Sequence, residues 1–476
     1  MRNKITKLRQ KAGWWRRLGL LMASCALLAG CAVPSFLLPP TPVPTSVNAI
    51  PSKTRRPPTE TPLPTANFQA RATATPKAAK KASPTPSPTI TDTPFDVKAT
   101  VKIAVHLPLT GDSAAAGNSL YNAARLAVRQ LSSPLNQQGI AVELVAFDDQ
   151  HDVETAVKNA NQFTADPGFL CGLGGYNYNV MLQVEDIYHQ AGLAFIDPSL
   201  TAPGITEKRY LEINRLIGRT DGEGIAAAQF TKAKGFKSVY IISVSPSDGK
   251  KNVSGFLNTS AELGLKQAGY TITNLTEGFK TIIGKVTYLK PDVVYFPGSA
   301  IQLGNFIREA RTAGYQGAFI GSESANNPGF ADLAGPLALQ GGGTFFTSTS
   351  AAPGAYPGAT QFVKDYQAAY GANAAMNSNA LQAYDALGMC LKAIENIVAK
   401  KNGLPRSDQI VLPTRQEVVS AIRAMQDYPG ISGTYSFNLR GDPLQVDYFV
   451  YQLSTSDPKK WGSNPLVGTF RTAPPL

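Results

Sequence analysis

The sequence predicts an α/β protein with two lobes, each built around a parallel β-sheet. At 476 residues the chain is too long for one ordinary hydrophobic core. From Val101 onward, short apolar runs typical of buried strands alternate with amphipathic helical segments. This alternation is the pattern of parallel sheets with right-handed crossovers. A second series of the same kind begins near Asp221, which indicates two successive units of similar design.

The first unit opens with a predicted strand at 101–105, a loop and a helix whose apolar face includes Leu120, Ala124, Ala127 and Leu131. In open α/β sheets, ligands lie in the loops at the carboxyl ends of such strands. The loop that ends at Gly117 is therefore the first candidate for a ligand-facing wall. The remaining elements of this unit are expected as strands at 140–147, 169–171 and 193–196 and as helices from 153 and at 180–190.

The second unit is expected to contain helices at 225–234, 256–269 and 303–313 and strands at 238–244, 270–275, 293–296 and 318–320. Two further helices are predicted at 359–370 and 379–399. The chain then closes with a β segment at 433–437 and a strand at 445–453.

The formal net charge of +12 belongs to the N-terminal segment. Residues 1–95 hold 14 Lys/Arg and 2 Asp/Glu, which leaves 31 basic and 31 acidic side chains in the rest of the chain. The folded part is therefore neutral and carries no excess of basic residues that would suit a nucleic acid.

The first 31 residues are typical of an export signal. Basic residues precede an apolar run at 18–30 that is too short to cross a bilayer. The run ends in Leu28-Ala-Gly-Cys31, which resembles the bacterial lipobox and implies cleavage before Cys31 and lipidation of its side chain. The alternative is ordinary signal cleavage with Cys31 incidental. Residues 32–97 follow as a Pro/Thr-rich segment, with 15 of the 35 prolines at 32–95, and are predicted to be a disordered tether.

Motifs for catalysis, metals or nucleotides are weak. Gly172-Leu-Gly-Gly-Tyr resembles half of a dinucleotide fingerprint, but a tight turn explains its glycines equally well. Neither the three histidines nor the cysteines have metal-ligand spacing, and Cys171 and Cys390 are interpreted as small core residues, with a disulfide permitted. No metal, no cofactor and no enzymatic activity is predicted.

Polar, uncharged loop ends recur directly after the buried strands. Hydroxyl and amide groups near helix N-termini suit a carboxylate, and one acid, Glu323, would suit an ammonium group. A small zwitterion held between two lobes is therefore the predicted ligand. For any one of these residues, a helix cap is the alternative role. The segments that carry them are 109–111, 176–179, 199–201, 245–248, 299 and 322–324.

The chain resembles the type I periplasmic-binding-protein family, in particular the solute-binding components of branched-chain amino acid ABC importers. The stretches that carry the resemblance span about 98–465 and include Ile103-Ala-Val-His-Leu-Pro-Leu-Thr-Gly, Asp197-Pro-Ser-Leu-Thr-Ala-Pro, Arg219-Thr-Asp, Phe319-Ile-Gly-Ser-Glu and Ala383-Tyr-Asp-Ala-Leu. The resemblance implies two Rossmann-like lobes joined by a three-strand hinge near 218–221, 345–349 and 426–430. Lobe 1 would comprise 98–219 plus 347–428, lobe 2 would comprise 220–346 plus 429–465, and 466–476 would form a C-terminal tail.

The same resemblance assigns site residues. It implies that Ser199, Thr201 and the loop of Asn177, Tyr178 and Asn179 bind the α-carboxylate of the ligand, and that Glu323 holds its α-ammonium group. In the family, aromatic residues often line the side-chain pocket, and their positions fall near Ala116, Asp248 and Ser299 of this chain. The end of the first strand is therefore expected to carry no aromatic wall, and the side-chain pocket is undefined. An amide, a short peptide or another small organic solute stays open as the ligand.

The predicted function is therefore that of an extracytoplasmic solute-binding protein, anchored through Cys31, which delivers an amino acid or a related solute to ABC permease subunits. The alternative is a sensor of the same fold that acts on a separate signalling partner.

Overall fold

The computed structural model describes residues 95–244, 248–276, 278–402 and 410–475. The expected export signal, Cys31 and nearly all of the expected tether lie outside the described residues. Among the helices of the described part of the chain, none is both long and apolar enough to cross a bilayer.

The first lobe contains a five-stranded sheet in the order β2-β1-β3-β4-β5, with every pair parallel. The first strand is almost completely buried from Val101 onward because apolar side chains point to both of its covered faces. The strands are β1 (Ala99–Leu107), β2 (Ile140–Asp148), β3 (Phe169–Gly174), β4 (Ala194–Asp197) and β5 (Ile213–Arg215).

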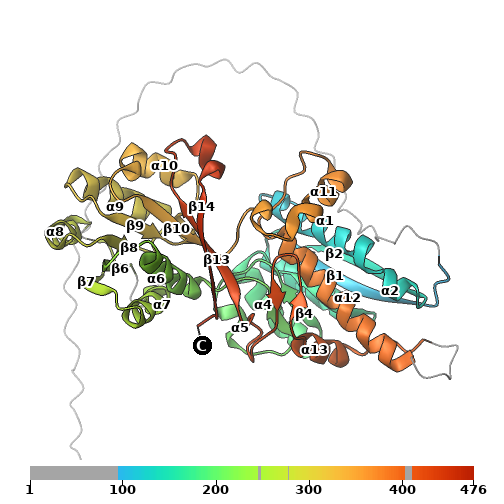
Figure 1. The fold of residues 1–476 in the computed structure, drawn as a ribbon. Coiled ribbons are helices and arrows are strands. Elements are labelled where there is room, and N and C mark those ends of the chain that lie inside the picture. Colours follow the sequence, from blue (N-terminus) through green and yellow to red (C-terminus); the bar gives the residue numbers. More distant parts are fainter. Residues whose placement is uncertain (1–94, 245–247, 277, 403–409, 476) are drawn as a thin grey trace, which may run out of the picture. The chain divides into compact units, whose positions relative to one another are not determined.

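Helices from two distant parts of the chain cover this sheet. On one face, α1 packs beside α12 over β1 and β3, and Figure 1 shows the two helices side by side. The other face is covered by α3 and α4 through an aromatic cluster that includes Phe163, Tyr188 and Phe195. The helices of this lobe are α1 (Ala114–Leu131), α2 (Ser133–Asn136), α3 (Val153–Thr164), α4 (Tyr178–Gln190), α5 (Gly204–Glu207), α11 (Ala359–Tyr370), α12 (Ala380–Asn402) and α13 (Arg415–Arg423).

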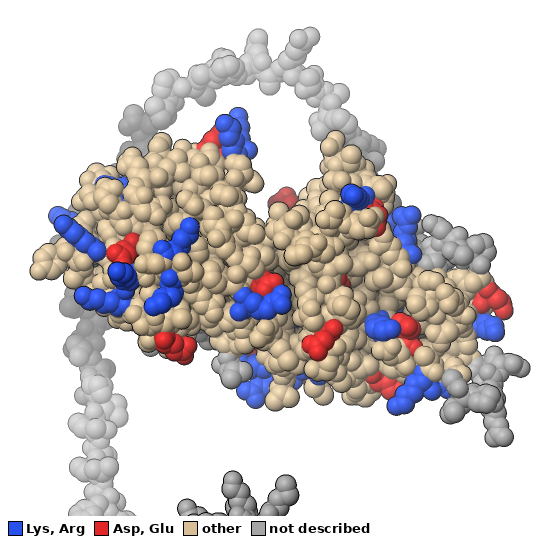
Figure 2. Space-filling view, viewed as in Figure 1, with Lys and Arg blue, Asp and Glu red and all other residues tan. Residues whose placement is uncertain are grey.

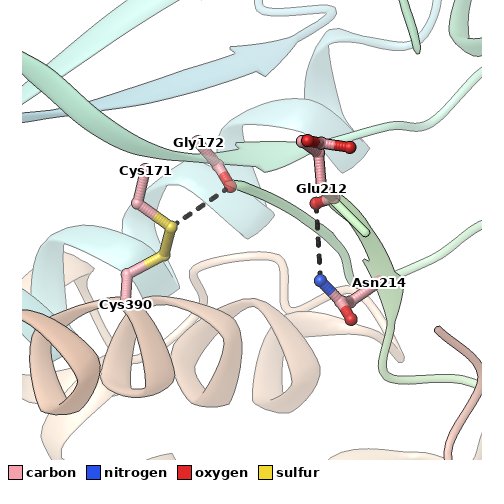
Figure 3. The surroundings of a disulfide bond; sticks show 5 residues. All are labelled: Cys171, Gly172, Glu212, Asn214 and Cys390. Atoms are coloured by element: carbon pink, nitrogen blue, oxygen red, sulfur yellow. Dashed lines mark hydrogen bonds between the residues drawn. A yellow bond between two sulfur atoms is a disulfide. The ribbon is translucent and has the colours of Figure 1, made fainter. Parts of the chain in front are cut away.

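A disulfide joins the two cysteines of this lobe. Figure 3 shows Cys171 on β3 bonded to Cys390 on α12, and both residues are fully buried in the core between the sheet and α12. The bond connects positions 219 residues apart in sequence. The prediction that both cysteines lie in the core is therefore confirmed. The sequence permitted a disulfide between them, and the structure contains it.

The second lobe contains a seven-stranded sheet in the order β14-β13-β10-β9-β8-β6-β7. Its strands from β10 to β7 are parallel, whereas β13 and β14 add to it in antiparallel fashion. Helices α6 and α7 cover one face, and α8, α9 and α10 cover the other (Figure 1). The strands are β6 (Ser238–Ser243), β7 (Lys266–Ile272), β8 (Val293–Tyr295), β9 (Ala318–Gly321), β10 (Thr344–Ser348), β13 (Val446–Gln452) and β14 (Leu466–Thr472), and the helices are α6 (Glu223–Ala233), α7 (Asp248–Glu262), α8 (Lys280–Leu289), α9 (Ala300–Thr312) and α10 (Gly329–Ala334).

Two α/β lobes with mainly parallel sheets are thus confirmed, but some expected boundaries are wrong. The helix expected at 256–269 ends at Glu262, because Gly264 adopts a left-handed conformation (φ +69°) that stops it. The next strand begins at Lys266 instead of 270. The expected tail at 466–476 forms β14 up to Thr472, which completes the edge of the second sheet.

The boundary expected between residues 428 and 429 also differs from the structure. The short hairpin of β11 (Tyr428–Pro429) and β12 (Thr434–Tyr435) stays with the first lobe, since Tyr435 and Phe437 pack into its core. The Asp385 carboxylate on α12 accepts hydrogen bonds from the backbone of Ile431 and Ser432. The chain therefore returns to the second sheet at β13, which begins at Val446.

A buried charge network links this last segment to the end of β5. Arg215 and Asp442 are both fully buried, and Arg215 Nε lies 2.8 Å from Asp442 Oδ1. The other carboxylate oxygen of Asp442 accepts a hydrogen bond of 3.3 Å from Arg219, which also forms a two-point ion pair with Asp221. Two segments that lie far apart in sequence, 215–221 and the segment around Asp442, are therefore connected by charge where the chain passes between the lobes.

Candidate functional site

The loop after β3 positions the start of α4. Asn177 has an extended backbone, and its side chain accepts hydrogen bonds from the backbone N–H groups of Asn179 and Val180. Asn177 is therefore the N-cap of the helix, as the alternative for this residue predicts. Tyr178 and Asn179 begin the helix with exposed side chains, and the Tyr178 hydroxyl lies against Gly204 at the start of α5.

The loop after β4 carries Ser199 and Thr201, and it contacts the loop after β3. The Ser199 hydroxyl donates a hydrogen bond of 2.5 Å to the Gly175 carbonyl. The Thr201 carbonyl accepts a bond of 2.9 Å from the Thr220 N–H, which ties this loop to the segment that enters the second lobe. Both side chains are half-buried. The structure therefore brings the predicted carboxylate-binding residues of the first lobe into two neighbouring loops.

Asp197 holds the backbone of the loop after β4 through hydrogen bonds to its carboxyl group. One oxygen of its buried carboxyl accepts the N–H groups of Ser199 and Leu200, while the other has no hydrogen-bond partner among the described residues. Burial raises the pKa of Asp197 to about 7. A side chain on Gly175, whose φ is +89°, would approach this second oxygen to 2.8 Å.

The glycines of the 172–175 motif serve close packing within the lobe. A Cβ atom on Gly172 would lie 2.8 Å from the Phe195 ring, and one on Gly174 would collide with the His106 carbonyl of β1. These close approaches to protein atoms are enough to require glycine, so nucleotide binding is not needed to explain the motif. The motif is explained as a turn between closely packed strands, which was the alternative to nucleotide binding.

Ala116 lies in the first turn of α1 and is half-buried. Aromatic groups stand nearby in the neighbouring loops, because Ser113 just before α1 contacts His151 (Oγ to Nδ1, 3.0 Å) and His151 packs edge-on against Tyr176. The ring of Tyr176 is half-buried. The sequence predicts no aromatic wall at the end of the first strand, whereas these contacts bring the Tyr176 ring into the same group of loops.

Glu323 lies in the second lobe, at the start of a short 3-10 helix (Glu323–Ala325) that follows β9. Its carboxylate faces the residues that follow β10, and Oε2 accepts a hydrogen bond of 2.7 Å from the Thr349 hydroxyl. Ser348 Oγ lies 3.3 Å from Oε1. Burial raises the pKa of Glu323 above the ordinary value for glutamic acid. No ion pair of Glu323 with a basic side chain occurs among the described residues, so its charge is available to a cationic ligand group.

Glu223 is a second acid at this place that the sequence did not reveal. It is the first residue of α6, and its side chain is only 2% exposed. Glu223 Oε2 accepts hydrogen bonds from the Glu323 backbone N–H (2.8 Å) and the Thr347 hydroxyl (2.5 Å). The sequence signal that could have revealed Glu223 is its position between Gly222 and Gly224, at the start of an alanine-rich helix.

The other two predicted residues of the second lobe stand at helix starts. Ser299 is the exposed N-cap of α9, where its hydroxyl accepts the Gln302 N–H and the Gln302 side chain accepts the Ser299 N–H. Such a capping box accounts for the serine without a ligand. Asp248 begins α7, and its side chain lies outside the described part of the structure.

Six of the predicted site residues therefore form two groups, one on the loops after β3 and β4 and one at Glu323. No hydrogen bond or ring contact joins Ala116 or Ser299 to either group among the described residues, and the Asp248 side chain lies outside them. The described residues link them through the Thr201–Thr220 hydrogen bond and the short segment from Thr220 to Glu223, whose side chain holds the Glu323 backbone. The hydroxyls of Thr347, Ser348 and Thr349 complete the second group.

The surface carries charge of both signs. Figure 2 shows Lys and Arg interspersed with Asp and Glu on the face that it draws, without a continuous basic stripe. Among the described residues, His, Cys, Asp and Glu form no cluster that could hold a metal ion.

Comparison with known proteins gives consistent matches. The family model of the periplasmic binding protein matches residues 100–458. A Leu/Ile/Val-binding protein homolog 2 from Brucella abortus is 26% identical over 366 residues, which cover 76% of this chain and 93% of that protein. A leucine-, isoleucine-, valine-, threonine-, and alanine-binding protein from Pseudomonas aeruginosa is 29% identical over 238 residues, covering 50% of this chain and 64% of that protein.

Solved structures share the fold. A leucine binding protein from Thermotoga maritima superposes with a TM-score of 0.55 at 23% identity, covering 79% of this chain and 99% of that one. An ABC transporter substrate-binding protein from Desulfitobacterium hafniense, in complex with Leu, has a TM-score of 0.58 at 20% identity and covers 77% of this chain and 100% of that one. At these identities the likeness establishes the fold.

Proposed function

Because the chain belongs to the periplasmic binding protein family, whose members are solute-binding proteins and not enzymes, we propose that it binds a branched-chain amino acid such as leucine and delivers it to the permease of an ABC importer. The single observation that carries the ligand class is the Glu323 carboxylate, which is half-buried, held by Thr349 and without a basic partner among the described residues. A carboxylate in this setting favours a ligand with an ammonium group, since charged hydrogen bonds strengthen in a partly buried site.

The first lobe supplies the complementary half of the proposed site. Ser199, Thr201 and the start of α4 at Asn177, Tyr178 and Asn179 would bind the ligand carboxylate near the positive end of this helix, and the Ser199 hydroxyl would exchange the Gly175 carbonyl for the ligand. Ala116, Asp248 and Ser299 are proposed to border the ligand side chain. The half-buried ring of Tyr176 would add an apolar wall beside Ala116, which suits the branched side chains named in the relatives.

A thermal-shift screen tests the ligand class. A compound that binds only the native state raises the melting temperature, by an amount that grows with its concentration relative to Kd. Leucine, isoleucine and valine are expected to raise the melting temperature, and sugars and amino-group-free acids are not. Stabilisation by sugars or simple carboxylic acids alone would refute the proposal.

The substitution Glu323→Gln is expected to weaken leucine binding by about tenfold or more, because a hydrogen bond to a charged group contributes about 1.5–3 kcal/mol. Isothermal titration calorimetry of both proteins measures the change. Glu309→Gln, which alters an exposed acid on α9 of the same lobe, is the matched control and should leave the affinity unchanged. Equal affinities of the Glu323→Gln variant and the unmodified protein would remove Glu323 from the site.

We further propose that the protein works outside the cytoplasm, attached to the membrane through a lipid on Cys31. The leader pattern supports this proposal, and so does the buried disulfide, because disulfides persist in oxidising compartments. A lipid-attached protein of this kind would present its ligand to permease subunits at the membrane surface.

The substitution Cys31→Ser is expected to move the protein from the membrane fraction to the soluble fraction when cells are fractionated. Cys25→Ser, which changes the other cysteine of the leader, should leave the protein with the membranes. Membrane retention of the Cys31→Ser protein would contradict the lipid anchor.

A further inference from the structure

The Glu223 side chain at the start of α6 reaches the backbone of a second acid, Glu323, and neither acid has a basic side chain among the described residues to neutralise it. Glu223 Oε2 holds the Glu323 N–H at 2.8 Å, so the side chain of one acid is bonded to the backbone of the other. Among the described residues, neither carboxyl group takes part in an ion pair with Lys, Arg or His. Arg219 lies nearby in sequence, but its guanidinium is already paired with Asp221 and Asp442.

Glu223 is buried and Glu323 is half-buried, and the groups around both acids are nearly uncharged. The groups that face Glu223 are the Thr347 hydroxyl from β10 and the electrostatically coupled Tyr295 of β8 and Tyr448 of β13. Glu323 faces Ser348 and Thr349 and couples to Tyr451 of β13. The pKa values of these three tyrosines are raised, chiefly by burial, so the phenol groups stay neutral in the physiological range. Charge on Glu223 is favoured by the hydrogen bonds that it accepts from the Thr347 hydroxyl and the Glu323 N–H, and by the positive end of α6.

The hydroxyl groups around the two acids can accept a hydrogen bond from a protonated carboxyl group as well as donate one to a carboxylate. Ser348 Oγ lies 2.8 Å from the Ser350 carbonyl but 3.3 Å from Glu323 Oε1, so its single proton goes to the carbonyl. Its oxygen is then left as an acceptor that faces Glu323. Thr347 Oγ1 lies between Glu223 Oε2 at 2.5 Å and the Gly321 carbonyl at 3.3 Å, and it can donate to the carbonyl while it accepts from a protonated Glu223. The site therefore accommodates a bound proton on either acid.

We propose that Glu223 is a positioning residue that shares a proton with Glu323 in the empty protein, and that an ammonium group bound at Glu323 expels this proton to solvent. The inference rests on the proposed function, because it takes the ligand to carry an ammonium group. The step is a simple exchange: one O–H bond of the carboxyl pair breaks, the proton passes to the buffer, and the positive charge of the ligand takes its place.

Electrostatics gives the exchange its direction. Two carboxylates in one buried site cannot both ionise easily, and burial together with the neighbouring Glu323 raises the pKa of Glu223 to about 8. A cation placed at Glu323 favours the ionised form of both acids. Ligand binding and proton release are then linked, so the affinity for an amino acid rises with pH until the pair is ionised in the empty protein.

The test is calorimetric titration with L-leucine as the probe at pH 6, 7 and 8, in phosphate and in imidazole buffer, which both buffer over this range and differ in ionisation enthalpy. Leucine itself keeps both charges in this range, so any proton released comes from the protein. The binding enthalpies in the two buffers are expected to differ by the equivalent of up to about one proton per leucine at pH 7, and Kd should fall by up to about tenfold per pH unit. Glu223→Gln keeps an acceptor for the Glu323 N–H but cannot titrate, so its Kd should be flat across this range and its proton release should approach zero.

The controls separate this inference from the proposed function. Glu262→Gln, an exposed acid on α7, should keep the proton release of the unmodified protein. Leucine binding without proton release, or with the same release in Glu223→Gln, would overturn the inference and leave the proposed function standing. Absence of leucine binding at every pH would count against the proposed function and, with it, against this exchange.

The proton itself is tested without any ligand. A carboxyl group whose folded-state pKa is raised contributes stability at low pH that is lost as the pH rises through that pKa. The melting temperature of the unmodified protein relative to Glu223→Gln should therefore fall between about pH 5 and pH 8. A difference that stays constant over this range would show that no proton is held there, and the inference would be wrong.

Discussion

Removal of the Cys171–Cys390 disulfide is expected to lower the free energy of unfolding by about 5 kcal/mol. The bond closes a loop with a sequence separation of 219, and the entropy that such a cross-link removes from the unfolded chain grows with loop length. It also fastens α12 to β3, so it joins the two distant parts of the chain that make up the first lobe. The double substitution Cys171→Ala and Cys390→Ala, studied by denaturant unfolding, measures the loss.

Reductant provides the control for this prediction. The difference between the unmodified protein and the double variant should shrink once dithiothreitol reduces the bond, because both chains are then without the cross-link. Two small alanine side chains also replace buried sulfur atoms at fully buried positions, and this packing loss should persist under reducing conditions. Equal stability of the oxidised protein and the double variant would contradict a structural role for the disulfide.

The substitution Asp442→Asn is expected to cost about 3–5 kcal/mol of stability. Asp442 is the acid that lies beside two buried cations, Arg215 and Arg219, and removal of one partner from a buried ion pair leaves a charge without compensation. Arg219 keeps Asp221, whereas Arg215 retains carbonyl and hydroxyl acceptors from Leu200, Pro203 and Thr206 and the more distant charge of Asp197, whose own pKa is raised to about 7 by burial. The melting temperature and the denaturant midpoint should both fall.

A surface ion pair on the neighbouring strand gives the matched control. Asp447 on β13 forms a two-point pair with Arg471 on β14, whose side chain is more than half exposed. Exposed pairs contribute about 0–1 kcal/mol, so Asp447→Asn should change stability little. Similar losses in Asp442→Asn and Asp447→Asn would show that burial of the network adds nothing.

Elements with a clear period in the sequence could be predicted well. The helix expected at 359–370 is α11 with the same limits, because its apolar positions repeat on one face and glycines lie on both sides of it. The limits of α7 and β7 could not be read in the same way, since Leu263 and Leu265 fit a helix as well as a strand. The left-handed conformation of Gly264, which decides between them, becomes visible only in the structure.

Features that depend on partners distant in sequence were beyond prediction. Residues 466–472 have the alternation of an edge strand, but their role depends on antiparallel pairing with β13. The disulfide depends on the packing of α12 over β3. The return of the chain to the second lobe near Val446, instead of near residue 428, follows from contacts of the 431–443 segment with α12 and β5.

The candidate site divides in the same way. Glu323 could be named as a candidate because it follows a buried strand and matches a family pattern, and the structure gives it hydroxyl partners and no basic partner among the described residues. Its contact with a ligand stays a prediction. Glu223 was missed because its place between two glycines is a weak signal, and the local sequence does not show that it is buried against a residue 100 positions away. Tyr176 was read as part of a polar loop, and only its ring contact with His151 shows that it lies among the loops near the start of α1.

The measurement that tests the proposed function most directly is calorimetric titration with L-leucine and two matched analogues. One analogue, 4-methylpentanoate, lacks the ammonium group, and the other, 3-methylbutylamine, lacks the carboxylate. Leucine is expected to bind, and each analogue to bind more weakly by about tenfold or more, because each leaves one set of charged or polar groups without its partner. Failure of leucine, isoleucine and valine to bind, or binding of 4-methylpentanoate as tight as that of leucine, would contradict a site built around Glu323.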